Sequence, residues 1–313
     1  MAVDVALGMC FLSQTGVGIL GNSLLITFYL TSFLLGSKPK PTDLTLIHLA
    51  LVHTVILLTR GILIAARVLG LEFVQNDAEC KLLGFVYRIT RALSLCTTCL
   101  LSTVQAITIG PSTSYLFQLK IQIQRFILSV LPILWIPNSL ISPNLLLQMF
   151  ASPNITNTDT NCYMVPISTI LQGLILTFMA LCDILSLGLM SCCSGYMVLL
   201  LHRHRHQVQH LHSPSQAPET SPERRATQTI VLLVSCFVVF YCGDLVSSLF
   251  LGTSMKNNDA VFNATMFLTS EYATISPFVL LTCDRRVIKF PTDFLGNRTL
   301  KSSQTTVLSA SPL

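Results

Sequence analysis

Charged side chains occur inside several of the most apolar stretches of this 313-residue chain. In a bilayer a buried charge is costly unless it faces the protein interior or a water-filled cavity, so such residues mark candidate functional sites. Their chemistry is ion pairing or recognition of a polar ligand, and it requires no covalent step. The residues are Arg60, Arg88, Arg91, Asp244 and Glu271.

The composition predicts that these residues lie in a membrane. Hydrophobic residues make up 51% of the chain and charged residues only 11%, whereas a soluble domain carries roughly 25% charged residues. The net charge of +5 gives no support for a nucleic-acid partner. We therefore expect a multi-pass protein of the plasma membrane whose surroundings are lipid.

The apolar segments predict an all-α membrane protein with seven transmembrane helices, because each span needs about 20 mainly apolar residues. The tail, 284–313, has no further apolar run and is expected to be a disordered cytoplasmic segment. The membrane-spanning domain would occupy 1–283, with spans at about 7–35, 44–69, 82–109, 126–150, 166–201, 226–251 and 262–283.

The distribution of Lys and Arg predicts the orientation, because cytoplasmic loops are enriched in them. With the amino terminus outside, only three of the 19 fall in outer segments, namely Arg67, Lys81 and Lys256. The amino terminus is therefore expected to be extracellular and the carboxyl terminus cytoplasmic.

The buried charges are expected to converge on the outer half of the bundle. At 1.5 Å per residue, Arg91 lies about 16 Å below Cys80, and Glu271 lies about 13 Å down the last span. Glu271 is therefore the expected partner of Arg91. Asp183 is expected about 25 Å from the outer end of its own span. Either structural ion pairs or a ligand cavity would explain this layer. The candidate ligand residues are Arg91, Arg88, Tyr87, Glu271, Asp244 and Arg60.

Two cysteines are expected outside the membrane, where disulfides form and persist. Cys80 begins the third span and Cys162 lies in the loop between spans four and five. Their pairing would attach that loop to the bundle. The same loop contains the sequon Asn154-Ile-Thr, which makes Asn154 the expected glycosylation site.

Two patterns suggest metal ligands, but neither predicts a metal site. Cys96-x-x-Cys99 lies in a lipid-embedded helix with no second ligand pair. The run from His202 to His212 aligns histidines on one helical face, yet it fits a basic helical extension at the membrane surface better. No metal or cofactor is therefore expected.

Several short motifs, taken in order, resemble the vomeronasal type 1 pheromone receptors. They run from about Gly18 to Lys289. The motifs are Gly18-Ile-Leu-Gly-Asn22, Thr59-Arg-Gly-Ile62, Ser94-Leu-Cys-Thr-Thr-Cys-Leu-Leu-Ser-Thr-Val-Gln-Ala-Ile-Thr108, Tyr196-Met-Val-Leu-Leu-Leu-His-Arg-His204, Gln207-Val-Gln-His-Leu-His212, Ser221-Pro-Glu-Arg-Arg-Ala-Thr227 and Tyr272-Ala-Thr-Ile-Ser-Pro-Phe278.

The resemblance implies a receptor that binds a small pheromone-like chemosignal and activates a heterotrimeric G protein of the inhibitory class. It also supports the Cys80 to Cys162 bridge and glycosylation of Asn154. His53, Ala92 and Gly110 depart from the family pattern. The residues expected to face the G protein are Thr108, Gly110, Arg203, Arg205, Arg224 and Arg225.

Three other classes of protein share some of these features. A bitter-taste-like receptor has the same architecture, but the cysteine pair and the Gln207–His212 run favour the vomeronasal type. A transporter would be expected to show internal repeats, and none is evident. An intramembrane aspartyl protease would need Asp183 and Asp244 at one depth, and their expected depths differ. The chain is therefore not expected to be an enzyme.

Overall fold

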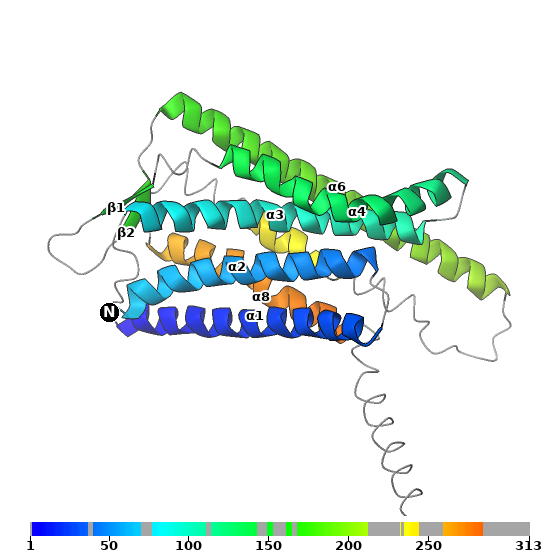
Figure 1. Cartoon of the computed structure of the whole chain (residues 1–313), viewed down its shortest axis with the longest axis horizontal. Helices are drawn as coiled ribbons and strands as arrows, with labels where there is room; N and C mark the ends of the chain where they lie inside the picture. Colours follow the sequence, from blue (N-terminus) through cyan, green and yellow to red (C-terminus); the bar gives the residue numbers. More distant parts are fainter. Residues whose placement is uncertain are drawn as a thin grey trace, which may run out of the picture.

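The computed structural model is a bundle of long helices with one β-hairpin (Figure 1). It describes residues 2–36, 40–69, 77–110, 114–142, 149–152, 161–164, 168–211, 232, 235–243 and 259–283. Residues 235–243 are helical and are called the helical segment 235–243. The other elements are α1 (Ala2–Leu34), α2 (Pro41–Leu69), α3 (Asp77–Ile109), α4 (Ser114–Ile141), β1 (Met149–Ser152), β2 (Asn161–Met164), α6 (Thr169–Leu211) and α8 (Asp259–Cys283).

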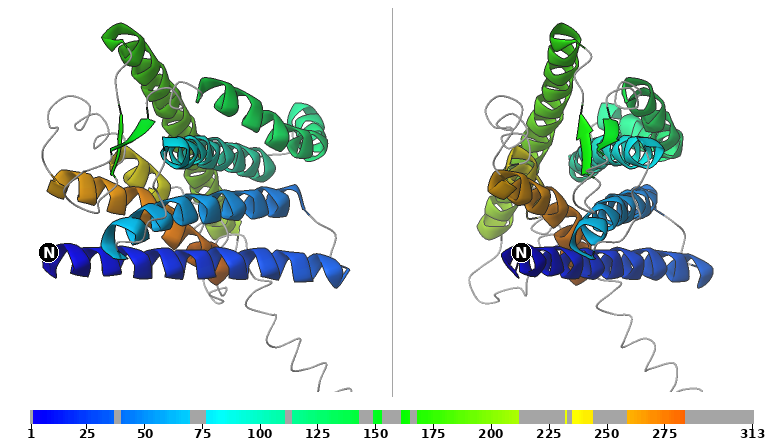
Figure 2. Two further views of the ribbon diagram at one scale, coloured as in Figure 1. Left: turned by 60° about the vertical axis from the view of Figure 1, so that its left-hand side comes forward. Right: turned by 90° about the vertical axis from the view of Figure 1, so that its left-hand side faces the viewer.

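Helix α3 is the central element of the bundle. It packs against α2, α4 and α6, while α8 packs against α1 and α2. Figures 1 and 2 show α1, α2 and α3 lying alongside one another, with α6 crossing the bundle obliquely. A side chain on α3 can therefore contact several helices, which makes this helix the natural scaffold for a site.

The connection between α1 and α2 shows how local sequence ends one helix and begins the next. Gly36 has a positive φ of 89°, and its backbone N–H donates to the carbonyl of Phe33, a common way to end a helix. Helix α2 then begins at Pro41, whose fixed φ suits a first helical position. The Asp43 carboxylate accepts a hydrogen bond from the backbone N–H of Lys40 at 3.1 Å, as in a capping box.

The β-hairpin marks one end of the bundle, which we call the hairpin end. Strands β1 and β2 pair antiparallel, with Ala151 opposite Cys162, and β1 packs against α3. The beginning of α3 and the start of α1 lie at this end (Figure 1). The hairpin was not expected from the sequence.

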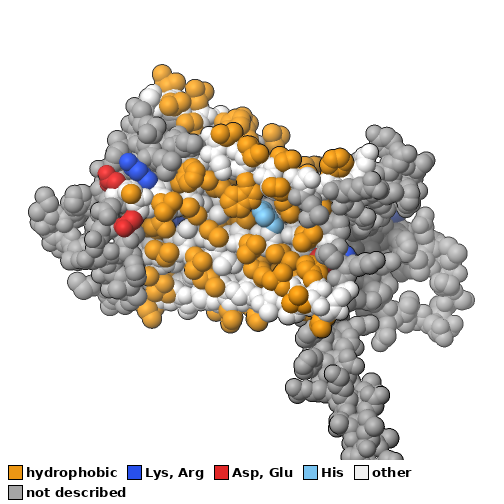
Figure 3. Space-filling model, viewed as in Figure 1, with side chains coloured by type: hydrophobic (Ala, Val, Ile, Leu, Met, Phe, Trp, Pro, Cys, Tyr) orange, Lys and Arg blue, Asp and Glu red, His pale blue; other side chains and the backbone are white. Residues whose placement is uncertain are grey.

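The outside of the bundle is apolar. Among the described residues, three helices are long and apolar enough to cross a membrane: Gly8–Leu34, Thr42–Ala65 and Gly173–Leu200. Hydrophobic side chains cover most of the described surface in Figure 3, and the visible charged groups gather mainly near its left-hand end. This surface fits lipid, as expected for a membrane protein.

Helices α1, α2, α3 and α8 begin and end within five residues of the expected spans, α6 ends ten residues beyond its expected span, and α4 differs most. The sequence predicted a span over 126–150, but α4 begins at Ser114, ends at Ile141, and is followed at Met149 by β1. The apolar residues up to Phe150 predicted that the helix would continue. Pro143, however, disfavours the helical conformation of Ser142, the residue directly after the end of α4. Of the expected span 226–251, the structure describes residue 232 and residues 235–243.

Gly18 allows α1 to approach α2 and α8 closely, which generates a first prediction. A Cβ there would lie 2.7 Å from Leu57 Cδ1, 2.8 Å from Thr274 Oγ1 and 3.2 Å from the Thr274 Cα. We expect Gly18→Ala to lower the free energy of unfolding by about 1–3 kcal/mol through overpacking. Thermal unfolding of the purified protein in detergent measures the change.

Gly16→Ala is the matched control, because a Cβ at Gly16 would meet nothing within 4 Å. It should leave the melting temperature unchanged or slightly raised, since alanine favours a helix. Equal melting temperatures for the two variants would contradict the close contact at Gly18.

Candidate functional site

An ion pair joins α3 to α6 inside the bundle. Arg91 Nη2 lies 3.1 Å from Asp183 Oδ2, and the two side chains are only 16% and 12% exposed. In a largely buried setting each charge stabilises the other, and removing either partner would leave an uncompensated charge. The pair therefore fixes how α6 sits against α3.

This partner differs from the expected one. The sequence predicted Glu271 as the partner of Arg91 and placed Asp183 about 25 Å from the outer end of its span. The structure begins α3 at Asp77 and α6 at Thr169, so Arg91 and Asp183 each lie fourteen residues from the first residue of their helix, about 21 Å along it. The expected depths differed because α3 begins three residues before Cys80, from which Arg91 was counted, whereas α6 begins three residues after Pro166, from which Asp183 was counted.

Arg91 also connects α3 with the helical segment 235–243. Its Cζ lies 5.8 Å from the ring centroid of Tyr241, within the range of a cation–π interaction. Tyr241 stacks on Phe237, with ring centroids 4.1 Å apart. One arginine thus contacts both an acid on α6 and an aromatic ring on the helical segment.

Arg60 lies in a different environment. It is only 8% exposed, and its Cζ lies 3.8 Å from the ring centroid of Tyr87 on α3. Its Nε is buried and has no hydrogen-bond partner among the described residues. The structure therefore brings two of the expected ligand residues, Arg60 and Tyr87, into direct contact.

The remaining candidates are more dispersed. The Arg88 guanidinium on α3 donates to the sulfur of Met179 on α6. Glu271 lies on α8 and is partly exposed, and no ion pair to Arg91 is found among the described residues. Asp244 lies outside the described residues. The expected convergence of all five charges is thus only partly realised.

A buried histidine, His53, ties three helices together. His53 Nε2 lies 2.8 Å from Ser94 Oγ on α3, and Nδ1 lies 3.0 Å from Ser276 Oγ on α8. In a neutral ring one nitrogen donates and the other accepts, so one serine donates and the other accepts. The sequence had marked His53 only as a departure from the family pattern. Its position on an apolar helix was the signal that could have pointed to this node.

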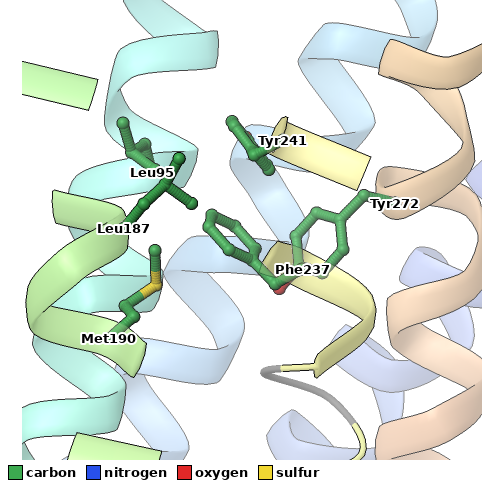
Figure 4. Close-up of a cluster of buried hydrophobic side chains, with 6 residues drawn as sticks. All are labelled: Leu95, Leu187, Met190, Phe237, Tyr241 and Tyr272. Atoms are coloured by element: carbon green, nitrogen blue, oxygen red, sulfur yellow. The ribbon is translucent and has the colours of Figure 1, made fainter. Parts of the chain in front are cut away.

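An aromatic cluster lies beside this node. Tyr272 on α8 meets the His53 ring edge-to-face at 5.2 Å and packs against Phe237 at 4.5 Å. Figure 4 shows the side chains pointing into a common centre from α3, α6, the helical segment 235–243 and α8. The buried members are Leu95, Leu187, Met190, Phe237, Tyr241 and Tyr272.

A second histidine, His48, links α2, α3 and α4. Trp135 Nε1 donates to His48 Nε2 at 3.1 Å, and His48 Nδ1 lies 3.1 Å from Thr97 Oγ1. Because an indole N–H only donates, Nε2 must accept, which places the proton of a neutral ring on Nδ1. Thr97 then accepts from His48.

A cavity of about 300 Å³ lies between α3 and α6 towards the end opposite the hairpin. Gly110, one of the expected G-protein-facing residues, lines it. Thr108 and Arg203 are exposed, Arg205 lies on α6, and Arg224 and Arg225 lie outside the described residues. The lining is Thr103, Ala106, Ile107, Gly110, Cys192, Cys193 and Tyr196.

Cys80 at the hairpin end is fully buried and disulfide-bonded. Cys162 lies on β2, and Asn154 lies outside the described residues. Cys96 and Cys99 are free. Within the described ranges, no three His, Cys, Asp or Glu side chains are grouped so that they could hold a metal ion.

An apolar helical bundle with an internal ion pair and buried polar contacts fits a polytopic membrane protein, and its sequence relatives identify the class. Residues 5–292 match the vomeronasal organ pheromone receptor family. The chain belongs to this family, and with it to the seven-helix chemosensory receptors that couple to G proteins.

Individual relatives agree with this assignment. Vomeronasal type-1 receptor 100 of Rattus norvegicus is 37% identical over 285 residues, which cover 90% of this chain and 87% of the relative. Vomeronasal type-1 receptor 90 of the same species is 37% identical, covering 91% and 93%. Vomeronasal type-1 receptor 1 of Gorilla gorilla gorilla is 38% identical, covering 90% and 81%.

The ion pair generates a second prediction. Asp183→Ala leaves Arg91 without its carboxylate, so we expect the free energy of unfolding to fall by about 3–5 kcal/mol. Replacing both residues, as Arg91→Met with Asp183→Leu, should recover most of the loss because neither charge of the pair is then left buried without its partner. Thermal unfolding in detergent compares the variants.

Cys182→Ala serves as the control for that comparison, because Cys182 is adjacent on α6 but exposed and free. It should behave like the wild type. If the single and double variants at Arg91 and Asp183 proved equally stable, the pair would carry no net electrostatic stabilisation.

The His53 node generates a third prediction. His53→Leu removes the ring that contacts Ser94 and Ser276, and we expect a loss of about 1–3 kcal/mol for each hydroxyl left unsatisfied. His53→Asn keeps a donor and an acceptor and should lose less. Thermal unfolding in detergent compares the stability of the two variants. A leucine variant as stable as the asparagine variant would contradict a hydrogen-bonding role of His53.

Proposed function

We propose that this receptor binds a small chemosignal at the hairpin end and activates a heterotrimeric G protein of the inhibitory class at the opposite end. The observation that carries the proposal is the Arg91–Asp183 ion pair, together with the contact of Arg91 on Tyr241. These contacts join α3, α6 and the helical segment 235–243 in the interior. A ligand that alters them changes how these helices pack.

The proposed topology has seven spans with the hairpin end outside the cell. The described helices support it, because α1, α3 and α6 begin at the hairpin end and α2 ends there (Figure 1). The scarcity of Lys and Arg in the segments assigned to that side agrees. The disulfide at Cys80 agrees as well, because disulfides persist in oxidising compartments.

Cys162 is the proposed partner of Cys80. Strand β2 carries Cys162 and pairs with β1, which packs against the helix that carries Cys80. The sequence between the two strands contains Asn154, so the proposed glycan would be attached to the connection of the hairpin. Bond and glycan would both lie on the extracellular side.

The proposed ligand site lies among Arg60, Tyr87, Arg88, Arg91 and Glu271, with Asp244 as a further candidate. Arg60 and Tyr87 supply a cation over an aromatic face. Apolar side chains around them, such as Ile56, Phe85 and Ile89, suit a ligand with an apolar body. The site recognises its ligand by contact and charge alone.

The mechanism is a shift between two helix packings. An agonist that binds one packing better than the other shifts the equilibrium towards it. The ion pair and the Tyr241 contact transmit the shift from α3 to α6 and the helical segment. At the opposite end, the cavity beside Gly110 and the basic residues Arg203 and Arg205 offer the surface for the G protein.

A protease mechanism is disfavoured by the same pair. The Asp183 carboxylate already accepts a hydrogen bond from Arg91, so it is not available to share a proton with a second aspartate.

A fourth prediction tests the proposed function. Cells expressing the full chain should lower cyclic AMP in response to at least one member of a panel of small volatile and steroid-like compounds, and pertussis toxin should abolish the response. Arg91→Ala should reduce potency at least tenfold, because the link between α3 and α6 is lost.

Surface staining of an epitope-tagged chain separates signalling from folding, and the Arg91→Met, Asp183→Leu double variant controls for stability. A wild type that reaches the surface but never responds would contradict the receptor function. Equal responses of the wild type and a surface-displayed Arg91→Ala variant would contradict the role of the pair.

A further inference from the structure

The hairpin-end half of the bundle contains buried polar groups that the protein itself leaves without partners in its described part. Arg60 Nε on α2 and both amide atoms of Gln14 on α1 are buried, and none has a hydrogen-bond partner among the described residues. Buried donors and acceptors are rarely left unsatisfied, and each such group calls for an explanation. A bound ligand is one explanation with a testable chemistry.

The two side chains lie at the same level. Their sequence neighbours Thr15 and Gly61 are in contact, because a Cβ on Gly61 would lie 2.9 Å from Thr15 Cγ2. Arg60 also lies on the face of α2 that contains His53, seven residues away. The Arg60 side chain therefore sits above the His53 node, about 10 Å nearer to the hairpin end.

Tyr87 has the same relation on α3. It lies seven residues before Ser94, the residue that contacts His53, and so on the same face of its helix. The Arg60–Tyr87 contact at 3.8 Å thus stacks directly above the His53–Ser94 contact. Arg60 and Tyr87 therefore form a polar layer on the hairpin side of the buried His53 node.

The charge of Arg60 is not balanced by the described residues. A contact with an aromatic face contributes about 0.5–2 kcal/mol, which is less than the several kcal/mol that burying a cation costs. The Asp183 carboxylate, which could supply a counter-charge within the spans, is already paired with Arg91. No ion pair to Arg60 is found in the described part of the chain.

We infer that Arg60, lying over Tyr87, binds an oxyanion such as a carboxylate, carried at one end of an otherwise apolar ligand. A guanidinium offers a planar fork of donors that matches two carboxylate oxygens. The Gln14 amide offers a further donor and an acceptor at the same level. This inference rests on the proposed function, because it assigns the charged end of the ligand of that same site.

The test measures binding without signalling. The full-chain receptor is placed in nanodiscs of phosphatidylcholine, and thermal unfolding is followed with decanoate, methyl decanoate or decylamine. Decanoate at tenfold excess over its Kd should raise Tm by about 2 °C, whereas the ester and the amine should not. Nanodiscs containing phosphatidylserine test whether a lipid headgroup supplies the oxyanion instead.

The variants identify the residue. Arg60→Gln should abolish the decanoate shift, and Arg60→Lys, which keeps the charge but loses the fork, should weaken the apparent affinity about tenfold. Lys81→Gln is the matched control, because it removes a positive charge at the same end of α3 and should keep the shift. If Arg60→Gln does not fold, the affinity of Arg60→Lys for decanoate tests the inference in its place.

Several outcomes would overturn the inference. A decanoate shift that is equal in the wild type and in the Arg60 variants does so, and so does a Tm shift with methyl decanoate that equals the shift with decanoate. The inference would also be overturned if Asp244→Asn lowered the stability and the double variant Asp244→Asn, Arg60→Gln restored it. Asp244 would then be the counter-ion of Arg60. A shift that depends on Arg60 without any G-protein signalling would support the oxyanion site and contradict the proposed function.

Discussion

Within a bilayer no water is available to hydrogen-bond a buried polar group, and the arrangement around α3 follows from this constraint. Ser94, Thr97, Thr98 and Ser102 are all at most 1% exposed. Thr98 and Ser102 donate to carbonyls of their own helix, while Ser94 and Thr97 contact His53 and His48 of α2. The contacts with His53 and His48 require Ser94 and Thr97 to face α2, so they fix the rotation of α3 against α2.

The remaining helices are held to this centre with unequal strength. Helix α1 is fixed by small residues and by Asn22, whose amide donates to the carbonyls of Gly18 and Ala273, which ties α1 to α8. Helix α6 has fewer attachments, because its buried residues form one stripe on the face towards α3. These are Asp183, Leu187, Met190 and Met197. Helix α6 is therefore the element whose position depends most on one ion pair.

The sequence predicted most helices to within a few residues, because long apolar segments are a strong signal. It did not predict the partner of Arg91. Pairing depends on the exact helix start and on rotation, and α1 and α6 are apolar on nearly all sides, so their sequences do not encode which face is buried. The Ser94, Thr98 and Ser102 spacing on α3 was readable as one polar face. The partners on α2, His48 and His53, required the packed structure.

The two arginines that face the interior differ in what a ligand could gain from them. An oxyanion approaching Arg91 must compete with the Asp183 carboxylate already 3.1 Å away, so only the difference between the two interactions would favour binding. At Arg60 no such competitor lies among the described residues, and the full interaction is available to a ligand. An oxyanion would therefore gain more by binding Arg60, while Arg91 remains paired with Asp183 and links α3 to α6. Tyr87 and Arg91 lie four residues apart on α3, one turn along the same face, so a ligand that displaces the ring under Arg60 acts on the helix turn that holds α6.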